Sequence, residues 1–312
     1  YRTMNSILVT AKINPDLDGC ACVLAYADFL IQNGKNAEGV IFGCPQSEVS
    51  YFSDRHGIMI PTCSEETTGE WTHCVLVDGS SMMGMPKAVI PEHVIEIIDH
   101  RAGSEPKKEF PNAKIQNELV GAAATLVTER FMNAGRVPSR EHALLLYGAI
   151  HHNSLNFLST NTHQRDHDAV EFFEKLYGFD RRIIEEMFRY ATDSIIKDPY
   201  TAIEDDGKEF GKGYTIGAYQ LIVWGDEILQ KKRELEEAVK RISAENGEQW
   251  AVLNIIDVAQ SVGFLYCTHA DQYTIVEQAL AVVVNKGWTS LKPALLRKQI
   301  MPLISKIANE HE

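Results

Sequence analysis

The chain has 312 residues, of which 45% are hydrophobic and 23% are charged, a balance typical of globular proteins rather than disordered or fibrous ones. Thirty Lys and Arg residues against 43 Asp and Glu residues give a formal net charge of −13, which excludes a broad basic surface for duplex nucleic acid. No apolar run reaches the roughly 18–20 residues that span a bilayer, and the first residues lack a signal-peptide pattern, so we expect a cytoplasmic location.

The first half of the chain alternates short apolar runs with helical segments. A strand is predicted at residues 6–11 and a helix from about 20 to 32, with a polar loop between them. Further strands are predicted at residues 37–42, 74–78 and 94–99. Apolar strands that alternate with helices predict a parallel sheet covered on both faces. Helical spacing continues over residues 121–134, 140–152, 168–179 and 181–196.

The pattern changes near residue 200. Pro199 interrupts the last of these helices, and the acidic stretch Glu204-Asp-Asp-Gly207 follows it, which indicates a domain boundary. Strands are then predicted at residues 214–223, 250–258 and 263–267, with a charged helix at 226–245. We therefore predict an α/β chain with a parallel-sheet domain at residues 4–197 and a smaller α/β domain at residues 200–312.

Polar residues stand at the ends of several predicted strands. Asp16 and Asp18 follow the first strand, Asp78 ends the run 74–78, and Asp99-His100-Arg101 ends the run 94–99. Ligands bind beyond the carboxyl ends of parallel strands, and Asp and His ligands suit manganese, magnesium or iron. Each residue also has a structural interpretation as a helix cap, a turn residue or a loop histidine. Their joint occurrence favours a metal site.

Five segments carry a resemblance to a known family, namely Asn14-Pro-Asp-Leu-Asp-Gly19, Val77-Asp78, Asp99-His100-Arg101, Gly121-Ala-Ala-Ala-Thr125 and Asn153-Ser-Leu-Asn-Phe157. In order and approximate spacing they resemble the motifs of the DHH phosphoesterases. The segment 291–302 is similar to a basic segment of the DHHA2 domain, which manganese-dependent (family II) inorganic pyrophosphatases, exopolyphosphatases and prune proteins share. The resemblance covers nearly the whole chain. It implies a DHH domain with helices on both faces of its sheet, followed by a DHHA2 domain.

The resemblance implies a pair of metal sites that share Asp78. Asp16 and Asp78 would bind one cation, and Asp18, Asp78 and His100 would bind the other. The implied metal is Mn²⁺, and Mg²⁺ and Co²⁺ suit the same ligands. Two such cations activate water as a nucleophile for in-line displacement at phosphorus. Asp99 is expected to support the site through hydrogen bonds.

The resemblance also implies which groups bind substrate. Arg101 stands where a pyrophosphatase has its second histidine, and a guanidinium there would clamp a phosphate. Arg297 and Lys298, from the second domain, are expected to neutralise the distal phosphate. The implied active site therefore lies in the cleft between the two domains.

Three positions depart from the pyrophosphatase pattern. Lys12 replaces a metal-binding histidine, Asn153 replaces a metal-binding aspartate, and Leu296 replaces an arginine of the basic segment. The Lys12 ammonium either takes the place of one cation and binds phosphate or is a solvated loop group. His152, next to Asn153, is either a replacement metal ligand or a partly buried histidine at a helix end.

A further polar cluster has the composition of a metal site. Within Thr162-His-Gln-Arg-Asp-His-Asp168 stand His163, Asp166 and His167. We interpret this stretch as a polar loop that leads into a helix, with Asp166 or Asp168 as the helix cap.

We therefore expect a metal-dependent phosphohydrolase that uses metal-activated water to cleave a short phosphoanhydride, pyrophosphate or a short polyphosphate. One alternative is a phosphodiesterase or nucleotide phosphatase of the same family. The other is a degenerate member that binds a phosphate ligand or a protein partner without turnover. The expected partner is a small anionic phosphate, with no duplex nucleic acid and no membrane, and the resemblance leaves a homodimer open.

Overall fold

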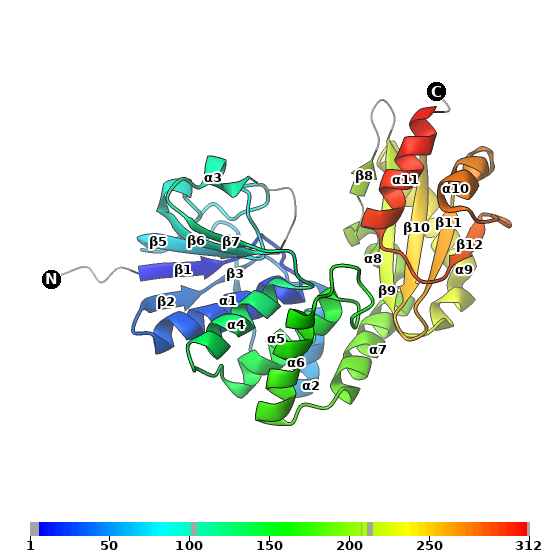
Figure 1. Cartoon of the computed structure of the whole chain (residues 1–312). Helices are drawn as coiled ribbons and strands as arrows, with labels where there is room; N and C mark the ends of the chain where they lie inside the picture. Colours follow the sequence, from blue (N-terminus) through cyan, green and yellow to red (C-terminus); the bar gives the residue numbers. More distant parts are fainter. Residues whose placement is uncertain (1–5, 101–104, 207, 211–214, 311–312) are drawn as a thin grey trace. The chain divides into compact units, whose positions relative to one another are not determined.

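The computed structural model describes residues 6–100, 105–206, 208–210 and 215–310 (Figure 1). The chain divides into two compact units, Tyr1–Met187 and Phe188–Glu312. This division falls within helix α7 (Arg182–Lys197), whereas the sequence pattern places the boundary after that helix. Each unit has its own five-stranded sheet.

The sheet of the first unit is parallel throughout, in the order β2-β1-β5-β6-β7. Its strands are β1 (Ser6–Thr10), β2 (Asn36–Gly39), β5 (His73–Val77), β6 (Val94–Asp99) and β7 (Lys114–Asn117). Four of the five residues are buried in each of β1 and β5. Such continuous burial requires cover on both faces of the sheet.

Helices provide that cover on both sides of the sheet. The helices of this unit are α1 (Leu17–Gln32), α2 (Ser47–His56), α3 (Pro106–Glu109), α4 (Ala123–Asn133), α5 (Arg140–Asn153) and α6 (Gln164–Tyr177), with a 3-10 turn at Pro91–His93. Figure 1 shows α1 and α4 on one side of the sheet and α3 on the other. On the α3 side, Leu8 and Leu76 pack with Met85 and Phe110 in one apolar cluster. The predicted parallel sheet with helices on both faces is confirmed.

The strand predicted at residues 37–42 is divided into two. Its first part is β2, which pairs with β1, whereas β3 (Ile41–Phe42) pairs with β4 (Thr62–Cys63) in a separate small sheet. Val40 still donates its N–H to the carbonyl of Val9. After Val40 the chain no longer pairs with β1, and β3 pairs with β4 instead. A continuous apolar run in the sequence does not show such a change of pairing partner.

The second unit contains a mixed sheet in the order β12-β11-β10-β9-β8. Its strands are β8 (Lys208–Phe210), β9 (Ile216–Val223), β10 (Trp250–Asp257), β11 (Val262–Cys267) and β12 (Trp288–Leu291). Its helices are α8 (Pro199–Asp206), α9 (Lys232–Glu245), α10 (Tyr273–Leu280) and α11 (Arg297–Glu310), with 3-10 turns at Glu227–Lys231 and Ala270–Gln272. Strands β9 and β10 are parallel, and the other neighbouring pairs are antiparallel.

Strand β10 lies at the centre of this sheet, and all eight of its residues are buried. Leu253 belongs to one apolar cluster with Leu235 of α9, and Val252 belongs to another with Ile304 of α11. Neighbouring residues of a strand point to opposite faces, so this sheet also has an apolar core on each face. The predicted smaller α/β domain is confirmed.

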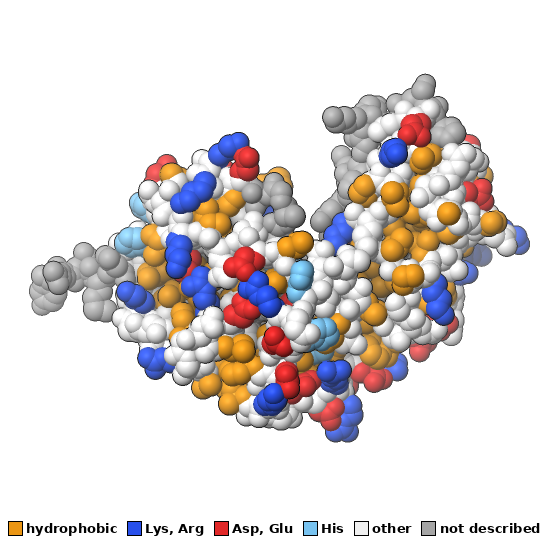
Figure 2. All heavy atoms as spheres, viewed as in Figure 1, with side chains coloured by type: hydrophobic (Ala, Val, Ile, Leu, Met, Phe, Trp, Pro, Cys, Tyr) orange, Lys and Arg blue, Asp and Glu red, His pale blue; other side chains and the backbone are white. Residues whose placement is uncertain are grey.

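The surface mixes charges of both signs. On the face shown in Figure 2, Lys and Arg side chains are interspersed with Asp and Glu, and no broad basic area is visible among the described residues. This distribution agrees with the net charge of −13. None of the helices in the described ranges is long and apolar enough to cross a membrane.

Candidate metal centre

Three described side chains bring potential metal ligands together. One ligand atom from each of Asp18, Asp78 and His100 lies within 4.8 Å of the others. His100 Nε2 is 3.6 Å from Asp18 Oδ2 and 3.5 Å from Asp78 Oδ1. The side chain of Asp18 is fully buried, and those of Asp78 and His100 are only 6% and 14% exposed. These three residues lie beyond the carboxyl ends of β1, β5 and β6, at the edge where the sequence predicts a metal site.

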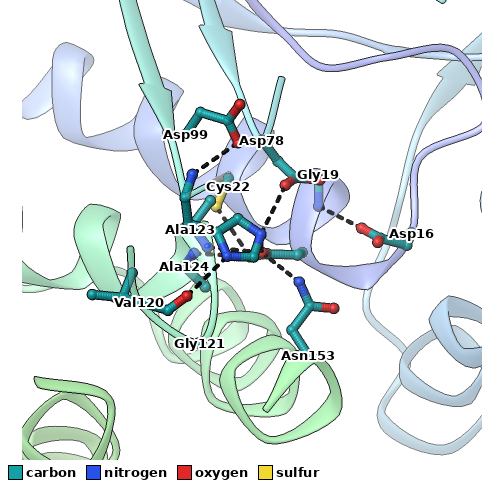
Figure 3. Close-up of polar contacts among 12 residues, drawn as sticks. Asp16, Gly19, Cys22, Asp78, Asp99, Val120, Gly121, Ala123, Ala124 and Asn153 are labelled. Atoms are coloured by element: carbon teal, nitrogen blue, oxygen red, sulfur yellow. Dashed lines mark hydrogen bonds and ion pairs between the residues drawn. The ribbon is translucent and has the colours of Figure 1, made fainter. Parts of the chain in front are cut away.

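Asp16 lies beside this group, at the start of α1. It is the N-cap residue of the helix, and its Oδ1 accepts the N–H of Gly19 at 3.0 Å. A Cβ on Gly19 would lie 3.6 Å from Asp78 Oδ2. Asp16 and Asp78 therefore approach Gly19 from different sides (Figure 3). Asp16 can therefore cap α1 and still lie beside Asp18, Asp78 and His100, which we call the metal group.

Asp99 connects the loop that follows β5 to the loop that follows β6. This residue is fully buried at the end of β6. Its Oδ1 accepts the backbone N–H of His100 at 2.8 Å, and its Oδ2 accepts the hydroxyl of Ser80 at 2.5 Å. Asp78, which begins the other loop, has a φ of 51°, in the left-handed region that Asp tolerates better than most residues. Asp99 thus fixes the backbone from which His100 extends.

The N-terminus of α4 supplies hydrogen-bond donors to Asp18. Helix α4 starts after Ala122, whose side chain makes no capping hydrogen bond. Asp18 Oδ2 accepts the N–H of Ala123 and Asp18 Oδ1 accepts the N–H of Ala124, both at 2.8 Å. The thiol of Cys22, one turn along α1, also donates to Oδ1. Free N–H groups and the helix dipole both favour a carboxylate at this end of a helix.

Burial and mutual charge shift the proton affinity of the metal group. Desolvation and the neighbouring Asp78 carboxylate raise the pKa of Asp18 to about 7. Burial alone would lower the pKa of His100, but its hydrogen bond to Asp78 and the charges of Asp18 and Asp78 raise it to about 9. His100 Nδ1 lies 3.0 Å from the carbonyl of Val120, so Nδ1 carries a proton that it donates there. The carboxylates repel each other in a medium of low dielectric constant.

Two of the three positions that depart from the pyrophosphatase pattern, Asn153 and Lys12, lie next to residues of the metal group or of its loops. Asn153 ends α5, and its Nδ2 donates to Asp18 Oδ2 at 2.7 Å (Figure 3). The Lys12 side chain runs along the loop after Asp78, where a Cβ on Gly79 would lie 3.5 Å from its Cγ and 3.6 Å from its Cε. Both residues are therefore placed to influence the site.

The two histidines before Asn153 differ in their surroundings. His151 is fully buried, and its Nδ1 lies 2.9 Å from Asn156 Oδ1. Desolvation lowers the pKa of His151 to about 4, so the ring is neutral at physiological pH. His152 is half-buried and does not belong to the group of three ligand residues found among the described positions.

The cationic residues expected to bind substrate have different surroundings. Arg297 is 12% exposed, and its Nη1 donates to the carboxylate of Asp206 at 2.5 Å and to the carbonyl of Ala218 at 3.0 Å. Lys298 is exposed, yet neighbouring atoms desolvate its ammonium enough to lower the pKa. Arg101 lies outside the described residues.

Sequence reasoning missed one contact near the site. The buried carboxylate of Asp166 accepts the N–H of Gly121 at 3.0 Å and the hydroxyl of Thr125 at 2.5 Å. It also accepts the N–H of His163 at 2.7 Å. His163, rather than Asp166 or Asp168, is the N-cap residue of α6, which begins at Gln164, and Asp166 takes part in the capping box as the third residue of the helix. Residues 121–125 stand out as a motif in the sequence, but nothing in the sequence shows that Asp166 contacts them.

Comparisons with known proteins agree with this arrangement. Residues 6–150 match the family described as DHH family, N-terminal domain. A protein of Exiguobacterium sp. named "Probable manganese-dependent inorganic pyrophosphatase" is 27% identical over 317 residues, which cover 98% of this chain and 100% of that protein. A Streptococcus mutans protein of the same name is 27% identical over 314 residues, with the same coverage of 98% and 100%.

Solved structures share the fold over the full length. The Methanococcus jannaschii protein described as a "putative family II inorganic pyrophosphatase" aligns with a TM-score of 0.74 and 21% identity, covering 97% of this chain and 99% of that one. An exopolyphosphatase-related protein from Bacteroides fragilis aligns with a TM-score of 0.52 and 12% identity, covering 99% and 93%. At such identities the likeness shows the fold alone.

Proposed function

We propose that this chain, whose residues 6–150 match the N-terminal domain of the DHH family, is a manganese-dependent phosphohydrolase that cleaves pyrophosphate or a short polyphosphate. The grouping of Asp18, Asp78 and His100 carries the proposal. Full-length relatives named as manganese-dependent inorganic pyrophosphatases support it.

The donor set fits a divalent cation. Two carboxylates and one imidazole, which make up the group, are ligands that Mn²⁺ accepts. The Val120 carbonyl accepts the proton on His100 Nδ1, which leaves the Nε2 lone pair on the side of the two carboxylates. Burial, and after it the neighbouring carboxylate of Asp78, raise the pKa of Asp18, so its negative charge is unfavourable without a counter-ion. A cation offsets that charge, and Mg²⁺ and Co²⁺ suit the same donors.

The residues of the chain hold and orient the site. When bound, the cation lowers the pKa of a water molecule and withdraws charge from the phosphoryl oxygens. Asp99 fixes the backbone of His100, and the N-terminus of α4 fixes Asp18. Donors that are fixed before the reaction reduce the reorganisation that the transition state requires. Asp16 is proposed as a further ligand next to Asp78.

Candidate ligands beside this set are Asn153 and His152. Asn153 donates its Nδ2–H to Asp18, so its amide oxygen would contact a metal only after the amide group turns over. His152 shares the end of α5 with it and stays a prediction.

Cationic side chains are proposed to bind the phosphates. Lys12 runs beside the loop that carries Asp78 and supplies a fixed positive charge to one phosphoryl group. Lys298 is exposed, and its desolvated ammonium gains free energy by pairing with the distal phosphate. Arg297 must first exchange its contact with Asp206. Arg101 stays a proposed phosphate contact on the strength of its position in the motif.

The direct test is phosphate release from pyrophosphate and tripolyphosphate by metal-stripped protein resupplied separately with Mn²⁺, Mg²⁺ and Co²⁺. We expect release that depends on the metal and is fastest with Mn²⁺. Because even outer partners of metal ligands contribute about 10–100-fold, Asp78→Asn is expected to lower the rate by more than about a hundredfold. Asp193→Asn, an equal change of charge at an exposed position of α7, should retain the rate. A folded Asp78→Asn variant with near-normal turnover would refute the assignment.

The contact between Asn153 and Asp18 favours a second candidate, a non-catalytic member that binds a phosphate ligand. The amide N–H of Asn153 occupies a lone pair of Asp18 Oδ2 that a cation would otherwise use. This candidate predicts thermal stabilisation by pyrophosphate and no phosphate release with any of the metals. Release from cyclic nucleotides or nucleoside phosphates alone would instead indicate the phosphodiesterase or nucleotide phosphatase alternative.

A further inference from the structure

We propose that Asp166 is a positioning residue for the metal centre, because it fixes the short segment that orients both Asp18 and His100. This inference rests on the proposed metal-binding function. Asp166 has no contact with the three grouped ligand residues among the hydrogen bonds described above, and it lies at the start of α6. It acts through residues 120–125.

The carboxylate of Asp166 joins the N-termini of two helices. Its side chain is fully buried. Oδ1 and Oδ2 lie 3.1 and 3.0 Å from the backbone nitrogen of Gly121, and Oδ1 accepts the hydroxyl of Thr125 at 2.5 Å. The N–H of His163 completes the set of donors at the start of α6. A buried carboxylate with this many donors has few ways to move.

Gly121 lies between the backbone groups that contact the metal ligands. One residue before it, the carbonyl of Val120 accepts the Nδ1 proton of His100. Two and three residues after it, Ala123 and Ala124 donate to Asp18. Displacement of Gly121 would therefore change the orientation of His100 and the hydrogen bonds of Asp18 together.

The close approach of Asp166 depends on glycine at position 121. A Cβ on Gly121 would lie 3.0 Å from Asp166 Oδ2 and 3.1 Å from Oδ1, which is closer than nearly all real Cβ contacts. Gly121 thus allows the carboxylate to lie directly against the backbone. This gives a physical reason for glycine at position 121.

Two variants separate positioning from simple capping of α6. Asp166→Asn keeps the size of the side chain but replaces one acceptor oxygen with an NH₂ group, so a single uncharged oxygen remains for the donors of Gly121, Thr125 and His163. Thr125→Val removes only the hydroxyl on the α4 side and leaves the α6 cap intact. Asp168→Asn is the matched control, because Asp168 is exposed on the same helix and accepts only from Gln164 among the hydrogen bonds described.

The readout is Mn²⁺ affinity, measured by calorimetric titration of the metal-stripped full chain, beside thermal unfolding of the metal-free protein. Both Asp166→Asn and Thr125→Val should weaken Mn²⁺ binding by about tenfold, while Asp168→Asn binds as the parent does. Loss of thermal stability with unchanged Mn²⁺ affinity in Thr125→Val would overturn the proposal and leave Asp166 as a cap alone. If the parent binds Mn²⁺ but releases no phosphate, the proposed reaction fails, and the affinity comparison still decides the role of Asp166.

Discussion

Both units contain buried charged side chains, but the proportion of carboxylates to cationic groups differs between the two regions. In the first unit, Asp18 and Asp78 face a single histidine, and the pKa of Asp18 is raised to about 7. In the second unit, the guanidinium of Arg297 meets the carboxylate of Asp206 and backbone carbonyls. A balanced buried pair fits a structural role, whereas unbalanced buried carboxylates fit a site that binds a counter-ion.

The pH should produce the largest contrast between these regions. The pKa of Asp18 rises from 3.8 to about 7 on folding and that of His100 from 6.5 to about 9, so the folded state holds more protons than the unfolded state. The stability of the metal-free protein should therefore fall as pH rises, across about pH 4–7 through Asp18 and about pH 6.5–9 through His100. Urea unfolding in the presence of a chelator, at pH 5, 7 and 9, measures this trend.

Bound Mn²⁺ should reverse the fall of stability with rising pH, because Mn²⁺ binds the deprotonated forms of Asp18 and His100. Near pH 7, where the raised pKa values of Asp18 and His100 keep protons on the metal-free site, binding of the cation should release protons. Calorimetry in buffers of different ionisation enthalpy counts them. His100→Gln should remove the share of that fall that His100 contributes between pH 6.5 and 9, while the fall through Asp18 moves to higher pH, because the positive charge of His100 lowers the pKa of Asp18. A stability profile identical to that of the parent would show that other groups cause the fall.

Removal of the partner of Arg297 should have the next largest effect, on stability and not on metal binding. Asp206→Ala leaves a largely buried guanidinium without its carboxylate, which we expect to cost about 2 kcal/mol of unfolding free energy. Asp205→Ala, at the exposed neighbouring position, should cost much less. Mn²⁺ affinity should be unchanged in both variants. Weaker Mn²⁺ binding in Asp206→Ala would contradict the separation of the two regions.

We expect the smallest effect from Asn153→Asp, which increases the excess of carboxylates over cationic groups at the metal centre. A third carboxylate in place of the amide that contacts Asp18 should raise Mn²⁺ affinity by about tenfold, within the range expected for an added metal contact. It should also destabilise the metal-free protein by about 1 kcal/mol, because like charges in a buried site repel. Calorimetric titration and urea unfolding measure the two changes. An unchanged affinity would show that residue 153 does not contact the metal.

The parallel sheet and its carboxyl-end residues could be predicted from the sequence, because both leave local patterns. Apolar runs ending in Asp78 and Asp99 are visible along the chain, and parallel topology brings their ends to one edge. Contacts between distant elements could not be predicted. Asp166 reaches Gly121 across 45 residues and Asn153 reaches Asp18 across 135, and both contacts depend on how α5 and α6 pack. The partner of Arg297 likewise became known only from the packing of α8 against β9.

Helix α4 has no side-chain cap at Ala122, and the carboxylate of Asp18, 105 residues before Ala123 in the chain, accepts the N–H of Ala123 instead. A helix end without a local partner gains its hydrogen bonds only after a long loop has closed. The first turn of α4 and the metal group should therefore become ordered in one step of folding. The arrangement of the metal group is therefore not added to a finished fold, since the contacts between Asp18 and α4 complete both.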